Sequence, residues 1–185
     1  FEFCRNLKKI ILPKHLSTIE SRTFYMSGLQ EINIHENITS IGEKAFYNCD
    51  SLTSVVIPDT VTDIGSSAFW NCSALTTVTM SSGIVNIGND AFTNCNRLNE
   101  NSYDNGYYLG NAENPYIALI GSVEGITACV IHPDTRVIGS YAFDDRGSLR
   151  GIVIPDSVIT IDGAAFRNCS NLRYAIIGSG VTNID

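Results

Sequence analysis

Six cysteines are the first candidates for chemistry, because thiolates bind metal ions and pair as disulfides. Five of them follow a phenylalanine by three residues: Cys4, Cys49, Cys72, Cys95 and Cys169. Cys49, Cys72 and Cys95 are each 23 residues apart. This spacing matches no zinc pattern of the Cys-x2-Cys type. Stacked neighbours would present parallel Cβ vectors, which suit a disulfide badly. We therefore predict a column of small buried thiols, and the cysteine count indicates nothing about the redox compartment.

The other candidate groups do not form a recognisable site. His35 and His132 each end a strand-like run, too far apart to share a metal, and His15 stands alone. Asp144-Asp145 lacks the ligand spacing of a calcium loop. The chain has no Gly-x-Ser-x-Gly elbow and no Gly-Lys-Ser/Thr phosphate loop. We predict no catalytic residues, no metal, no cofactor and no enzymatic activity.

Asparagines precede four of the cysteines, at Asn48, Asn71, Asn94 and Asn168. We predict that each amide satisfies the backbone of its own turn and of the next repeat. Glycosylation sequons begin at Asn37, Asn71 and Asn168. The last two arise from the repeat itself, so we expect them to be partly buried.

An internal repeat explains most of these positions. Phenylalanine recurs at Phe1, Phe24, Phe46, Phe69, Phe92, Phe143 and Phe166, in steps of 22 or 23 except for one step of 51. A leucine column runs in phase through Leu7, Leu29, Leu52, Leu75, Leu98, Leu149 and Leu172. An isoleucine column does so through Ile19, Ile41, Ile64, Ile87, Ile138, Ile161 and Ile184. Three columns in one phase indicate a stack of similar units.

One unit, residues 46–68, shows the expected elements. The segment from Phe46 to Cys49 predicts a tight turn or one short helical turn. Residues 52–57 alternate apolar and other residues, which is typical of a strand, and Pro58 ends it. Residues 61–64 predict a second short strand before Gly65 allows a bend. One unit cannot enclose its apolar residues, whereas stacked units can.

The pattern Leu-x-x-Val-x-Ile-Pro-x-x-Val-x-x-Ile-Gly-x-x-Ala-Phe-x-x-Cys resembles the BspA-type leucine-rich repeat. Residues 52–72 and 149–169 carry it most fully, the latter with Asp162 in place of glycine. The resemblance implies an α/β leucine-rich-repeat solenoid of seven repeats of about 23 residues. It implies a parallel concave sheet, short convex strands and short helical turns. It also implies a non-catalytic adhesion or ligand-binding role on a surface or secreted protein of a host-associated microbe.

We predict a single domain, 1–185, with an insertion at 99–126. Neither end carries a cap with a polar outer face, which solenoids need. We therefore expect a fragment of a longer protein, with an open end that forms a dimer as the alternative.

Composition excludes several classes of protein. The net charge is -7 and no run of lysine or arginine occurs, so a nucleic acid is not the expected partner. No apolar stretch reaches the roughly 18 residues of a transmembrane helix. No secretory leader is visible, which is weak evidence in a chain that opens with Phe1.

The concave sheet is the first candidate binding surface. One outward column is predicted to contain Ile11, Asn33, Val56, Thr79, Val130, Val153 and Ile176, and its neighbour Lys9, Glu31, Ser54, Thr77, Ala128, Gly151 and Tyr174. The first column is more apolar than a plain solvent face, which suits docking. The alternative is that β-branched residues simply favour strands.

The insertion is the second candidate. It holds Tyr103, Tyr107, Tyr108 and Tyr116, half of the eight tyrosines. Two strand-like runs around Asn111–Pro115 predict a β-hairpin. The tyrosines either face a ligand, as at many interfaces, or pack back onto the solenoid.

We predict an interaction or adhesion module of an extracellular or cell-surface protein, with a protein or matrix ligand. The alternatives are carbohydrate binding through the insertion tyrosines and a structural spacer. The candidate ligand-binding residues are Tyr107, Tyr108, Tyr116, Val56, Thr79, Val130, Val153 and Ile176.

Overall fold

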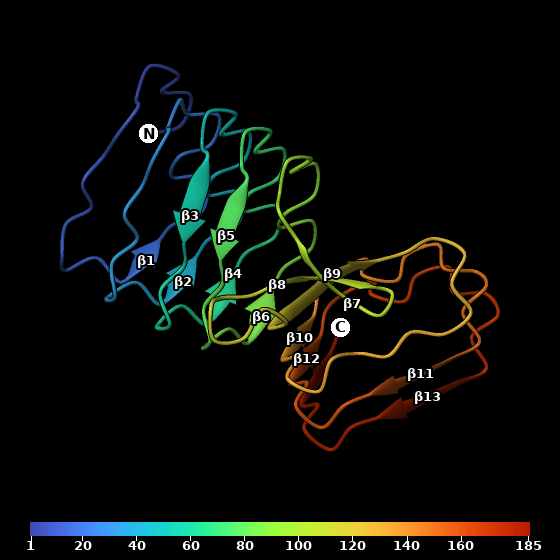
Figure 1. Cartoon of the computed structure of the whole chain (residues 1–185). Helices are drawn as coiled ribbons and strands as arrows, with labels where there is room; N and C mark the ends of the chain where they lie inside the picture. The colour runs from blue at the N-terminus through green and yellow to red at the C-terminus, as the bar shows by residue number, and fades with distance from the viewer. The chain divides into compact units, whose positions relative to one another are not determined.

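Residues one repeat apart in the sequence pair as parallel strands. Ile41 pairs with Ile64, and Val55 pairs with Val78. The computed structural model describes residues 1–185, which divide into two units, Phe1–Asn99 (unit 1) and Glu100–Asp185 (unit 2). In each unit the chain winds as a β-solenoid, about seven turns in total, and Figure 1 shows the successive turns stacked within each unit.

Unit 1 contains two parallel sheets. The larger has the order β1 (Thr18–Ile19), β2 (Ser40–Ile41), β4 (Asp63–Ile64) and β6 (Asn86–Ile87). The smaller pairs β3 (Ser54–Val56) with β5 (Thr77–Thr79). The second extended run of the repeat forms a strand in four turns, whereas the first forms one only in the two turns that contain β3 and β5.

Unit 2 has a six-stranded sheet and a two-stranded sheet. The six-stranded sheet runs in the order β14 (Asn183–Ile184), β12 (Thr160–Ile161), β10 (Val137–Ile138), β9 (Ala118–Ser122), β8 (Gly106–Leu109) and β7 (Asn101–Tyr103). The smaller sheet pairs β11 (Gly151–Ile154) with β13 (Tyr174–Ile177). None of the elements in either unit is a long apolar helix of the kind that crosses a bilayer.

The repeat columns form the core. Phe24, Phe46 and Phe69 are fully buried, and their rings stack at centroid distances of 5.3 and 4.9 Å. In unit 2 the rings of Phe143 and Phe166 stack at 5.0 Å. Most residues of the leucine and isoleucine columns are buried as well, as expected where each turn covers the apolar side of its neighbour.

The segments around each repeat phenylalanine are turns and not helices, so the predicted α/β class and short helical turns are wrong. Within residues 42–49 the N–H groups alternate between two kinds of bond. Cys49 N donates to Phe46 O at 3.2 Å within the turn, whereas Phe46 N donates to Ala68 O of the next turn at 2.7 Å. Asn48 has a left-handed φ of 55°. An α-helix needs right-handed φ and bonds four residues back along its own chain.

The asparagine column occupies these left-handed positions. Asn48, Asn71, Asn94, Asp145 and Asn168 have φ between 55° and 62°, a region that Asn and Asp tolerate better than most residues. Asn71 Nδ2 donates to Asn48 Oδ1 at 3.0 Å, and Asn168 Nδ2 donates to Asp145 Oδ1 at 2.8 Å. The amides of Asn71 and Asn168 therefore bond to the side chain one turn earlier in the column, where the sequence predicted bonds to backbone.

The predicted hairpin is present but belongs to a larger element. β8 and β9 pair antiparallel on either side of Asn111–Pro115, and β7 adds a third antiparallel strand. β9 also pairs in parallel with β10, where Leu119 lies opposite Ile138. The second half of the predicted insertion 99–126 therefore fills a strand position of the solenoid. The phenylalanine spacing hid this turn because it has no phenylalanine of its own.

Candidate functional site

Unit 2 exposes a row of aliphatic side chains on β11, β13 and the segment before them. Val130 bridges to Val153, and Val153 pairs with Ile176, so the three are neighbours on one face. Their exposed fractions are 59%, 55% and 58%. Ile152, which directly precedes Val153, is buried. The outward orientation predicted for these three residues is therefore confirmed. Figure 1 shows β11 and β13 side by side.

Tyr174 extends this row with an aromatic ring. It pairs with Gly151, and a Cβ placed on Gly151 would lie 2.2 Å from Tyr174 Cζ. The ring therefore lies across the glycine backbone, with the residue still 60% exposed. A depression of about 250 Å³ lies here, lined by Ala128, Val130, Gly151, Val153, Pro155 and Tyr174 among others. We call Val130, Val153, Ile176 and Tyr174 the apolar strip.

The sequence placed Gly151 and Tyr174 in one outward column but did not single them out. The sequence did contain a usable signal, because Tyr174, the largest side chain of this column, follows Gly151, its only glycine, by one repeat. In a parallel sheet such neighbours are adjacent, and the missing side chain leaves room for a ring.

The matching face of unit 1 is polar. Ile11 and Val56 are exposed, at 86% and 61%, but Asn33 lies between their turns and Thr79 is only half-exposed. The neighbouring column is polar as well, through Lys9, Glu31, Ser54 and Thr77, with Lys9 Nζ 2.5 Å from Glu31 Oε1. The predicted outward column is thus apolar and continuous in unit 2 only.

The insertion tyrosines pack back onto unit 2 for the most part. Tyr108 is fully buried, and its hydroxyl oxygen accepts a hydrogen bond from His132 N at 3.3 Å. Burial raises the pKa of Tyr108 to about 12. Tyr116 stacks on the His132 ring at a centroid distance of 4.0 Å, and Tyr103 contacts the same ring edge-on at 4.7 Å.

Tyr108 is therefore not a surface residue, and its predicted role in ligand binding is wrong. Tyr107 points the other way from Tyr108 on β8, because side chains alternate along a strand, and it is 36% exposed. Tyr107 and the half-buried Tyr116 are the candidate tyrosines that a ligand could still touch.

The cysteines form a ladder of thiol hydrogen bonds. Cys49 Sγ donates to Phe24 O, Cys72 to Phe46 O, Cys95 to Phe69 O and Cys169 to Phe143 O, each at 3.1 Å. All six cysteines are free. Cys49, Cys72, Cys95 and Cys129 are buried and Cys169 is half-buried, but Cys4 is exposed, which the predicted buried column did not allow.

This difference predicts selective alkylation. In native protein at pH 8 we expect iodoacetamide to modify Cys4 about 100-fold faster than Cys49, because attack needs an accessible thiolate. Burial raises the pKa of Cys49 and takes that of Cys129 to about 11, so raising the pH to 9 should leave both slow. Peptide mass spectrometry over time measures the rates, and equal rates for Cys4 and Cys49 would contradict the buried ladder.

The remaining polar candidates have structural partners. Asp144 Oδ2 lies 2.5 Å from Arg167 Nη2, and this hydrogen bond lowers the pKa of the Asp144 carboxyl. His35 Nε2 is 3.1 Å from Pro13 O, and His35 Nδ1 accepts from Asn37 N at 3.3 Å. No group of three or more His, Cys, Asp or Glu residues is arranged to hold a metal ion.

Unit 1 also carries an aromatic ladder that the sequence reasoning missed. Phe3 contacts Tyr25 edge-on, and the rings of Tyr25, Tyr47 and Trp70 stack at 4.8 and 4.6 Å. These residues directly follow the repeat phenylalanines or lie two after Phe1, so their spacing of 22 and 23 residues was a usable signal. The stacked rings of Tyr25, Tyr47 and Trp70 are half-buried.

Comparison with known families decides the nature of the repeat. Residues 1–110 and 123–185 match the BspA type leucine rich repeat region, in six copies. The chain belongs to this family. The resemblance recognised in the sequence is thereby confirmed. No functionally curated protein shows significant similarity to the chain.

Two solved leucine-rich-repeat structures with TM-scores above 0.5 share the fold. A leucine-rich repeat protein from Bacteroides ovatus is 22% identical, with a TM-score of 0.54 over 100% of this chain and 56% of that one. One from Eubacterium ventriosum is 21% identical, with a TM-score of 0.52 over 96% of this chain and 41% of that one. A leucine rich cell surface protein from Faecalibacterium prausnitzii is 24% identical, with a TM-score of 0.43 over 94% and 68%. The chain spans about half the length of the first two proteins.

Proposed function

We propose that this chain is a protein-interaction module and that the apolar strip of unit 2 is its docking surface. The observation that carries the proposal is the continuity of Val130, Val153 and Ile176 with the exposed ring of Tyr174. Large contiguous apolar patches on the surface of a soluble protein mark interaction sites. Leucine-rich repeats generally mediate protein interactions, and this family assignment supports the same conclusion.

The composition of the strip suits a protein partner. Burying the exposed half of one valine contributes about 1 kcal/mol, and a tyrosine that is already held in place adds apolar area at little entropic cost. Arg150 and Arg173 are exposed beside Gly151 and Tyr174 and form no ion pair. Guanidinium groups at the rim favour a partner that presents carboxylates around an apolar centre.

We further propose that residues 1–185 are one leucine-rich-repeat domain of a longer secreted or cell-surface protein with an adhesion role. The family supports this placement. Glycan binding through the insertion has less support, because Tyr108 is buried and Tyr116 is stacked on His132. A spacer role has less support because a spacer has no need of an exposed apolar strip.

The test is a pair of matched substitutions in a binding assay. Val153 and Val56 occupy the same repeat position with exposed fractions of 55% and 61%, so Val56→Asp is the control for Val153→Asp. Binding to a panel of purified extracellular-matrix proteins is measured by surface plasmon resonance. We expect Val153→Asp to weaken binding at least tenfold, since a charge would be desolvated against the partner's apolar surface, and Val56→Asp to change it less than twofold.

Thermal unfolding of both variants checks that each side chain is at the surface. Equal losses of binding from both substitutions would show that the strip is not the docking surface. A wild-type chain that binds none of the matrix proteins would count against a matrix ligand.

A further inference from the structure

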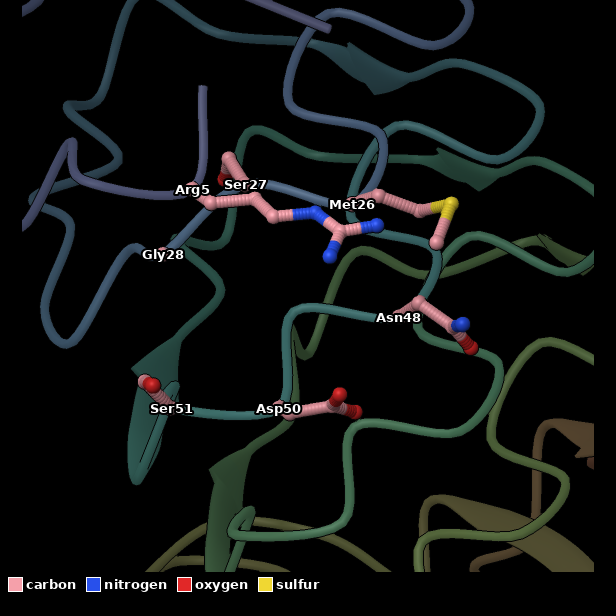
Figure 2. A pocket seen from close by; sticks show the side chains of 7 residues that line it. All are labelled: Arg5, Met26, Ser27, Gly28, Asn48, Asp50 and Ser51. Atoms are coloured by element: carbon pink, nitrogen blue, oxygen red, sulfur yellow. The ribbon is translucent and has the colours of Figure 1, made fainter. Parts of the chain in front are cut away.

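A polar hollow of about 240 Å³ opens on the turn face of unit 1. Arg5, Gly28 and Asp50 occupy the same position in three consecutive turns, four residues after Phe1, Phe24 and Phe46. Gly28 cannot be replaced by a larger residue, because a Cβ there would lie 2.0 Å from Arg5 O. The middle turn therefore contributes no side chain, and the hollow lies between Arg5 and Asp50 (Figure 2).

The two flanking charges do not neutralise each other. Their backbones are two turns apart, about 10 Å at the usual spacing of parallel strands. Neither Arg5 nor Asp50 belongs to any of the five ion pairs of the chain. The exposed guanidinium of Arg5 and the exposed carboxylate of Asp50 thus line one hollow from opposite sides without an ion-pair partner.

The asparagine ladder begins at this hollow, with Asn48. Met26 occupies the position that holds Asn or Asp in the later turns, with φ of 54°, a left-handed conformation that an unbranched apolar residue adopts with strain. Asn71 donates its amide to Asn48, but Met26 offers Asn48 no equivalent acceptor. The amide N–H groups of Asn48 are therefore available to the hollow, which Asn48 and Met26 both line.

Several features coincide at this one place. Arg5 and Asp50 form no ion pair, Gly28 contributes no side chain, and Met26 offers the Asn48 amide no acceptor. Convergent polar groups around a hollow are a mark of a small-ligand site. Figure 2 shows Arg5 and Met26 on one side of the hollow and Asn48 and Asp50 on the other.

We propose that this hollow binds a carboxylated monosaccharide, either free or at the end of a glycan. The Arg5 guanidinium pairs with the sugar carboxylate through two parallel N–H bonds. The Asn48 amide donates to a ring or hydroxyl oxygen, and the Asp50 carboxylate accepts from sugar hydroxyl groups. The Met26 thioether packs against the apolar C–H face of the ring.

Other small ligands use the lining less fully. A neutral sugar leaves the guanidinium of Arg5 without an anion. Phosphate and acetate offer Asp50 no set of hydroxyl donors, and a second negative charge is repelled by its carboxylate. A free amino acid pairs with Arg5 and Asp50 but has no further hydroxyl groups for Asn48.

The experiment is isothermal titration calorimetry on the full 185-residue chain with glucuronic acid as probe, and with glucose and glycine as matched comparisons. We expect glucuronic acid to bind with a Kd of about 1 mM or below. Glucose and glycine should each bind about tenfold more weakly, since one lacks the carboxylate and the other the hydroxyl groups. No binding of glucuronic acid at 10-fold excess over that value, or equal binding of glucose or glycine, would overturn the proposal.

Substitutions locate the site and check its chemistry. Arg5→Gln and Asp50→Asn should each weaken glucuronic acid binding about tenfold, while Arg97→Gln, on an exposed arginine of unit 1 outside the hollow, should leave it unchanged. Equal effects of Arg5→Gln and Arg97→Gln would place the sugar elsewhere and overturn the assignment. The methyl glycoside of glucuronic acid distinguishes a free sugar acid from one at the end of a glycan. Binding of the methyl glycoside indicates a terminal glycan residue. Binding of the free acid alone indicates a free sugar acid.

Discussion

Phe46→Ala should destabilise unit 1 by about 4 kcal/mol, because it empties the centre of a fully buried stack. The Phe46 ring lies 5.3 Å from the Phe24 ring and 4.9 Å from the Phe69 ring, and its exposed fraction is 0%. Neighbouring turns are held at the spacing of their strands, so they cannot collapse into the cavity. Urea unfolding followed by the fluorescence of Trp70, the single tryptophan of the chain and a residue of unit 1, measures the loss.

Phe3→Ala is the matched control for that substitution. Phe3 belongs to the aromatic ladder and contacts Tyr25, but it is 55% exposed. Truncation there should cost about 1 kcal/mol or less, since the ring keeps most of its contact with water in the folded state. A loss for Phe46→Ala no larger than that for Phe3→Ala would mean that the phenylalanine stack does not hold the turns together.

Gly65→Ala should destabilise the chain by about 3 kcal/mol, although it adds only one methyl group. A Cβ on Gly65 would lie 2.5 Å from Glu43 N and 2.6 Å from Gly42 C, both backbone atoms of the preceding turn. Backbone cannot move aside without separating β2 from β4, which pair through Ile41 and Ile64 at this point. The effect comes from close approach of two turns and not from an unusual φ.

Gly139→Ala tests this explanation, because Gly139 occupies the same repeat position in unit 2. Its nearest atom would be Leu119 O at 3.2 Å, a contact that small shifts can relieve, and the next repeat carries Asp162 at this position. We expect a loss below about 1 kcal/mol. Differential scanning calorimetry compares the two variants, and a larger loss for Gly139→Ala than for Gly65→Ala would rule out close approach as the cause.

The two candidate surfaces differ in how they relate to the repeat. The apolar strip uses positions that every repeat has, and it becomes a surface because consecutive repeats all place apolar residues there. The hollow uses a position that varies from repeat to repeat, where three consecutive turns carry Arg5, Gly28 and Asp50. A solenoid with both features can present an apolar protein-docking face in one unit and a polar site in the other, without a catalytic centre.

Much of this fold follows from the sequence alone, because one physical rule links sequence and structure. Residues 22 or 23 apart lie in adjacent turns, so the phase of the phenylalanine, leucine and isoleucine columns predicts the core and the strand register. The pairing of Val55 with Val78 and of Val153 with Ile176 follows in the same way. The thiol ladder was likewise predictable as a buried column, with the exception of the exposed Cys4.

The tertiary structure decided the features that the 22- or 23-residue spacing of the repeat does not predict. Whether a segment is a helix or a series of turns depends on bonds to the next turn, such as Phe46 N to Ala68 O, which replace bonds within the segment. β9 has no phenylalanine to mark it, so only its pairing with β10 shows that it belongs to the solenoid. Burial of Tyr108 depends on where the hairpin folds back.

The two candidate surfaces were determined partly by the sequence and partly by the tertiary structure. The sequence determined which side chains point outward, because alternation along a strand fixes this locally. Only the tertiary structure determined which of them join into a surface, as with Tyr174 lying across Gly151. The reason is that stacking places each side chain against partners a full turn away, and the space left by a small residue is filled or opened by its neighbours.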